Sequence, residues 1–150
     1  MNAFFAFLHH VAAFTLVSAL AVEFALIRDE LTVRRARSLQ LADAAIGVSA
    51  TVVLVVGLLR VFYFEKGSEY YFHSAPFIGK ISLFVVIALL SIYPTVQFVS
   101  WTKFLRQGQL PEVSPANLRT IRAIIHWELA GIVLLILCAA LMARGIGNLG

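Results

Sequence analysis

Charged residues are scarce in this chain of 150 amino acids. Asp, Glu, Lys and Arg make up 13% of it, whereas 61% of the residues are hydrophobic and the mean hydropathy is +0.90. Soluble domains usually carry about twice that share of charge, so the composition excludes an ordinary soluble domain. Four long apolar runs remain, and each is long enough for the roughly 20 residues that a helix needs to cross a bilayer.

Cysteine and clustered positive charge are also lacking. The single cysteine, Cys138, excludes an internal disulfide and a C-x-x-C metal or redox pair. The net charge of +4 comes from Lys and Arg in short segments between apolar runs, which is where membrane-topology signals occur. Because the sequence contains no basic patch or nucleic-acid-binding motif, we expect the lipid bilayer as a partner and no nucleic acid.

The apolar runs predict an all-α integral membrane protein. We expect one domain over 1–150, folded as an antiparallel, up-and-down bundle of four transmembrane helices. The expected helices cover residues 3–27, 39–64, 76–105 and 116–143. Pro76 is well placed to open the third helix and Pro115 the fourth, with Ser114 as its N-cap, and Pro94 should kink the third. The first run lacks a basic segment before it, so we expect it to be retained and not removed as a signal peptide.

The distribution of Lys and Arg predicts the orientation of the bundle. One face has eight basic residues: Arg28, Arg34, Arg35, Arg37, Lys103, Arg106, Arg119 and Arg122. The other has four: Arg60, Lys66, Lys80 and Arg144. The positive-inside rule therefore places both termini outside, which is the periplasm for a bacterial inner-membrane protein. The tyrosines Tyr63, Tyr70 and Tyr71 are expected in the outer interfacial belt.

Three of the four histidines are predicted at the outer level of the bundle. They are His9 and His10 in the first helix and His73 just before the third. An ionisable side chain in a bilayer is costly and marks a functional site by default, and imidazole is the commonest protein ligand for transition metals. We therefore predict that at least two of His9, His10 and His73 bind a metal or haem iron.

Other residues are candidates for holding a haem. His126, in the fourth helix, lies deeper than His9 and His10 and is an additional candidate ligand. Arg60 and Arg144 lie at the outer face, where a guanidinium group can pair with haem propionates. Because the depths of His126 and His9 differ, a haem would lie between the first helix and His73, or across a dimer interface.

A second polar layer is predicted in the inner half of the bundle. It contains Glu23, Asp43, Gln97, Arg122, His126 and Glu128. Helical periodicity places His9 and Glu23 within about 40° on one face of the first helix and turns Glu128 away from His126, toward a helix contact. We expect Glu23 to have a polar partner inside the bundle, since an isolated charge in lipid is costly. Alternatively, these residues only fix the register of the helices.

Several short motifs resemble one family of bacterial membrane proteins. They are Phe7–Phe14 (FLHHVAAF), Gly57–Gly67 (GLLRVFYFEKG), Tyr70–His73 (YYFH), Leu90–Val96 (LSIYPTV), His126–Leu129 (HWEL) and Leu141–Gly145 (LMARG). Over essentially its whole length the chain resembles the family catalogued as domain of unknown function 2214. That resemblance implies a small four-helix inner-membrane protein and carries no activity. More distantly, the architecture is similar to four-helix membrane cytochromes b of the superoxide oxidase type, which hold haem between histidines of facing helices.

Two functions are consistent with these features. The first is a redox protein that binds haem b, copper or both and passes an electron between oxygen or superoxide and membrane quinone, with quinone and a second copy of the chain as candidate partners. It would make the protein a membrane oxidoreductase. The alternative is a non-enzymatic assembly or transport component, in which Glu23, Asp43 and His126 form a proton or cation path. A Soret band or stoichiometric copper in the purified protein distinguishes the two.

Overall fold

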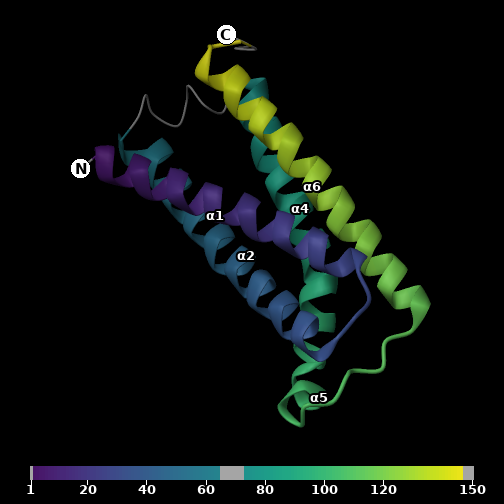
Figure 1. The fold of residues 1–150 in the computed structure, drawn as a ribbon. Helices are drawn as coiled ribbons and strands as arrows, with labels where there is room; N and C mark the ends of the chain where they lie inside the picture. The colour runs from purple at the N-terminus through teal and green to yellow at the C-terminus, as the bar shows by residue number, and fades with distance from the viewer. Residues whose placement is uncertain (1, 65–72, 147–150) are drawn as a thin grey trace.

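The computed structural model describes residues 2–64 and 73–146, and its regular elements are helices (Figure 1). They are α1 (Asn2–Arg28), α2 (Val33–Leu59), the π-helical turn η1 (Arg60–Phe64), α4 (Ala75–Ser100), α5 (Thr102–Arg106) and α6 (Pro115–Ala143). Four apolar segments, at residues 3–28, 33–63, 75–106 and 115–143, are long enough to cross a membrane. The predicted all-α architecture with four membrane-spanning helices is thus confirmed.

The bundle consists of two helical hairpins. α1 packs chiefly against α2 and α4 chiefly against α6, whereas α2 and α4 share few contacts. Figure 1 shows the start of α1 and the end of α6 in the upper part of the view and α5 at the bottom. We call the end with the two chain termini the terminal end, and the end with the α1–α2 turn and α5 the basic end. Among the long helices that touch one another, the seam between α2 and α4 is the loosest.

Local signals explain where the helices begin. Ser114 accepts a hydrogen bond from the Asn117 backbone N–H at 3.2 Å, and Pro115 occupies the first turn of α6, as predicted. α2 begins at Val33, earlier than the predicted start at residue 39, because Thr32 caps it by accepting from the Arg35 N–H at 3.2 Å.

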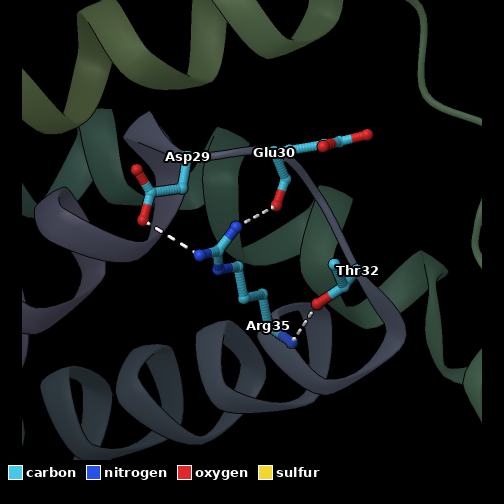
Figure 2. Close-up of polar contacts among 4 residues, drawn as sticks. All are labelled: Asp29, Glu30, Thr32 and Arg35. Carbon is cyan, nitrogen blue, oxygen red and sulfur yellow. Dashed lines mark hydrogen bonds and ion pairs between the residues drawn. The ribbon is translucent and has the colours of Figure 1, made fainter.

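The short α1–α2 turn is held by Arg35. Its guanidinium group lies 3.2 Å from the Asp29 carboxylate and donates to the Glu30 carbonyl oxygen at 2.7 Å (Figure 2). The Thr32 cap shown in the same view fixes the backbone of Arg35. These contacts explain why residues that the sequence analysis assigned to a loop are helical.

The third predicted helix is divided near its end. α4 stops at Ser100, and α5 follows after Trp101. The chain then leaves the helix at Gly108, whose φ of 69° lies in the left-handed region that favours glycine. Pro94 is buried inside α4, where its ring removes one backbone donor.

The hydrophobic core lies toward the basic end. Its fully buried side chains come from all four long helices and from the α4–α5 junction, and they include Leu20, Ile27, Leu39, Phe98, Ile121 and Ile125. At the terminal end the described residues form a smaller cluster around Val61 and Phe77. The bundle is therefore densely packed toward the basic end and more open toward the terminal end.

Candidate functional site

The four histidines take different positions. His9 is half-buried, whereas His10, His73 and His126 are exposed. The His9 and His10 rings are 6.0 Å apart and nearly perpendicular, and His10 Nδ1 donates to the Ala6 carbonyl oxygen of its own helix at 2.6 Å. His9 thus faces the bundle and His10 faces away, because adjacent residues on a helix lie about 100° apart.

Within residues 2–64 and 73–146, no three His, Cys, Asp or Glu side chains lie close enough together to hold a metal ion. His9, His10 and His73, which were grouped by their predicted depth, therefore do not form a three-ligand metal site within the described part of one chain. The proposal that these residues bind a metal stays a prediction. Lys66, Tyr70 and Tyr71, which the sequence analysis placed at the same level, lie outside the described residues.

His126 and Arg144 lie on the outside of the bundle. The His126 ring contacts Phe24 at 6.2 Å between centroids, and Arg28 lies over the same phenyl ring at 5.4 Å. Arg144 is exposed at the end of α6. Of the three residues predicted to hold a haem, only Arg60 lines an internal cavity.

That cavity, which we call the terminal cavity, lies between the two hairpins and has a volume of about 120 Å³. All four long helices and η1 contribute to its wall, which is mainly apolar. Its polar side chains are His9 from α1, Arg60 from η1 and Lys80 from α4. It is therefore an apolar chamber with three nitrogen-bearing side chains.

His9 is held in the terminal cavity by close packing. A Cβ atom at Gly57 would lie 3.3 Å from His9 Cε1, so the glycine leaves room for the ring. His9 Nδ1 is buried without a hydrogen-bond partner among the described residues, although the Val53 backbone lies close enough to interact with the ring. The charges that act on the ring most strongly are those of Lys80 and Arg60, both positive.

Deeper in the bundle, three carboxyl groups from three helices form what we call the acidic cluster: Glu23 of α1, Asp43 of α2 and Glu128 of α6. Glu23 and Glu128 are each only 2% exposed. All three interact electrostatically with one another. In the part of the chain that the structure describes, no Lys or Arg forms an ion pair with them.

Two of these carboxyl groups accept hydrogen bonds from hydroxyl groups of α4. Thr95 Oγ1 donates to Asp43 Oδ1 at 2.8 Å, and Ser91 Oγ donates to Glu128 Oε1. The prediction that Glu128 points toward a helix contact is confirmed. Ser91 and Thr95 were missed in the sequence analysis, although two hydroxyl residues one turn apart in an apolar run are a detectable signal.

Glu23 was predicted to have a polar partner, and for one of its two carboxyl oxygen atoms this prediction is wrong. Glu23 Oε1 is buried and has no hydrogen-bond partner among the described residues. Arg122, the basic residue predicted at this level, instead donates through Nε to the Ile27 carbonyl oxygen at 2.7 Å. The arginine therefore caps the end of α1 and does not neutralise the carboxyl group.

A second cavity, the central cavity, adjoins the acidic cluster. Its volume is about 160 Å³, and Asp43, Ser91 and Thr95 line it. A water molecule occupies about 30 Å³ in the liquid, so the space suits a few water molecules beside these polar groups. Phe84 lines both the central and the terminal cavity. Phe84 thus lies between the cavity that contains His9 and the cavity beside the acidic cluster.

These features define a four-span helical membrane protein with titratable groups in its interior. The chain belongs to the family described as "Predicted membrane protein (DUF2214)", whose model matches residues 1–147. No curated protein and no solved structure matches the chain. Family membership confirms the first resemblance noted in the sequence, and the similarity to membrane cytochromes b stays a resemblance.

Proposed function

We propose that this protein carries protons across the membrane through the interior of its four-helix bundle, as a non-enzymatic transport component. The observation that carries the proposal is the acidic cluster, in which Glu23, Asp43 and Glu128 lie together in the bundle without a basic partner among the described residues. Carboxyl groups inside transmembrane segments are typical of proton relays.

The chemistry of the cluster favours proton exchange. Three ionised carboxylates held together in a bilayer would repel one another and lose their hydration, which is very costly. A carboxyl group that takes up a proton becomes neutral and can also donate a hydrogen bond. The hydroxyl groups of Ser91 and Thr95 both donate and accept, and both line the central cavity, so they can pass a proton between the carboxyl groups and water that enters this space.

The two cavities suggest a route. A proton entering at the terminal end would pass His9, then Phe84 between the two cavities, and then reach Asp43. Toward the basic end the route meets the packed core, which includes Ile27 and Ile121. The bundle is thus closed on that side, and transfer to the basic end requires the helices to separate. Such gating is typical of a transporter and not of an open pore.

The test is proton flux into proteoliposomes that contain a trapped pH-sensitive dye, driven by a potassium diffusion potential. We expect wild-type protein to acidify the interior faster than empty liposomes do. Glu23→Gln, Asp43→Asn and Glu128→Gln should each lower the rate by about tenfold or more, since a relay needs every titratable member. The matched control is Glu112→Gln, because Glu112 is exposed in the α5–α6 linker.

The control variant should retain the wild-type rate. If wild-type liposomes are no faster than empty ones, the protein is not a proton carrier. If the three cluster variants conduct as well as Glu112→Gln does, the acidic cluster is only structural. Circular dichroism and size-exclusion profiles of each variant separate loss of flux from loss of folding.

A redox function is the second candidate, and the buried, unpartnered Nδ1 of His9 favours it. In this proposal the chain is a bacterial inner-membrane protein with both termini in the periplasm, and it passes electrons between oxygen or superoxide and quinone. The terminal cavity of about 120 Å³ does not enclose a whole haem, so in this proposal haem b lies partly outside it, against His73 or across two copies of the chain. Copper would need ligands beyond His9.

The visible spectrum and the copper content of the purified protein test this candidate. Single replacement of His9, His10, His73 and His126 by Ala should lower haem or copper content for at least two variants. A wild-type protein without a Soret band and without copper would rule out this redox function.

A further inference from the structure

We propose that the terminal cavity binds the carboxylate head of a single-chain fatty acid that enters from the bilayer. The inference does not depend on the proton pathway. It stands on the three nitrogen-bearing side chains of the cavity, its size, its depth and its opening.

The polar side chains of the cavity suit an anionic head. Lys80 and Arg60 contribute positive charge to the wall, and the charge of each acts on the His9 ring. His9 Nδ1 lacks a hydrogen-bond partner among the described residues. A carboxylate accepts hydrogen bonds from imidazole, guanidinium and ammonium groups, and such charge-assisted bonds are the stronger ones. A neutral ligand would gain little from the positive charges of Lys80 and Arg60.

The size of the cavity favours a carboxylate over a phospholipid head. A protein cavity of about 150 Å³ holds one benzene molecule, so a cavity of about 120 Å³ accommodates a group of similar or smaller size. That space accommodates a carboxylate group and the first methylene groups of one chain. A phosphodiester with its glycerol and two acyl chains is much larger.

The cavity lies where the head of an amphiphile would be found. With a rise of about 1.5 Å per residue, Lys80 lies roughly 8 Å from the start of α4 and His9 roughly 10 Å from the start of α1. These depths place the nitrogen atoms just below the interface at the terminal end. An acyl chain attached to a head at this level would extend into the hydrocarbon region.

The cavity also has an apolar opening toward the lipid. Leu54 and Leu58 of α2 line it, yet they are 39% and 38% exposed on the surface of the bundle. They lie on the helix that shares few contacts with α4, so the opening faces the loose seam between the hairpins. Next to it, Arg60 begins the π-helical turn η1, a distortion found frequently at functional sites.

The test measures retention of oleate by the full-length protein in nanodiscs of neutral phosphatidylcholine, counted by native mass spectrometry. Wild-type protein should retain one oleate per chain, whereas oleyl alcohol, which has the same chain without the charge, should not be retained. Acetate, which has the charge without the chain, should not displace oleate from the protein. Equal retention of oleate and oleyl alcohol would overturn the role of the basic groups.

Variants locate the site. Lys80→Gln and Arg60→Gln should each weaken oleate binding by about tenfold, the loss of one charge-assisted hydrogen bond. Lys103→Gln is the matched control, because Lys103 is exposed at the basic end, and it should bind like wild type. If a cavity variant does not fold, Leu58→Trp keeps the three polar groups and narrows the opening, and it should also lower retention.

Three further results would contradict the proposal. Oleate retained by Lys80→Gln, Arg60→Gln and Leu58→Trp as well as by wild type would place it elsewhere. An equal loss in Lys103→Gln would show attraction by overall charge. Displacement of oleate by phosphatidylglycerol at equal concentration would identify a phospholipid as the occupant.

Discussion

The contact between α4 and α6 depends on the absence of a side chain at position 131. A Cβ atom built on Gly131 would lie 2.9 Å from both Cγ1 and Cδ1 of Ile87, closer than real Cβ contacts allow. Small residues of this kind let membrane helices approach closely. We therefore predict that Gly131→Ala destabilises the bundle by forcing Ile87 or the helix to move.

The magnitude follows from two opposing effects. Overpacking of a well-packed contact costs about 1–3 kcal/mol, whereas replacing a helical glycine by alanine gains up to about 1 kcal/mol of helix propensity. A net loss of up to about 2 kcal/mol is expected for Gly131→Ala. Gly47→Ala is the control, because nothing lies within 4 Å of a Cβ at Gly47. It should leave stability unchanged or raise it by up to about 1 kcal/mol.

The assay is reversible unfolding by sodium dodecyl sulfate in mixed micelles, followed by the fluorescence of Trp101, which is buried. Adding Ile87→Ala to Gly131→Ala removes the atoms in conflict, so the two substitutions should show a favourable coupling of about 1–2 kcal/mol in a double-mutant cycle. If Gly131→Ala is as stable as Gly47→Ala, or if the cycle shows no coupling, the close approach of α4 and α6 at this position is not real.

Two further predictions concern the polar interior and the orientation. Thr95→Val should lower stability by about 1–2 kcal/mol, because Asp43 loses a hydrogen-bond donor inside the bundle. The control is Thr15→Val, because the Thr15 hydroxyl group bonds only to its own helix; it should change stability by less than about 0.5 kcal/mol in the same assay. Equal effects of the two substitutions would refute the prediction. A reporter that is active only outside the cytoplasm should be active after Gly150 and inactive within residues 107–114, and the reverse pattern would overturn the orientation derived from the basic residues.

Much of the fold could be predicted from the sequence because its causes are local. Apolar runs longer than about 20 residues predict membrane-spanning helices, and Ser114 with Pro115 predicts where α6 begins. Helical periodicity also correctly placed His9 and Glu23 on one face of α1 and turned Glu128 toward a helix contact. These inferences need only the geometry of one helix.

The partners of the polar residues required the tertiary structure. The sequence places Glu23 and Arg122 at similar depth, but only the packing of α1 against α6 shows that Arg122 donates to the Ile27 carbonyl oxygen. Likewise, the hydrogen bond from the Thr95 hydroxyl group to Asp43 depends on how α4 is rotated about its axis.

The same limit applies to the histidines and to the cavities. His9, His10 and His73 share a predicted level, yet only His9 faces the terminal cavity. Depth along a helix follows from counting residues, whereas the rotation and spacing of neighbouring helices follow from side-chain packing across the whole bundle. The sequence by itself therefore determined the spans and their polar layers, and the packing of the two hairpins decided which polar groups meet.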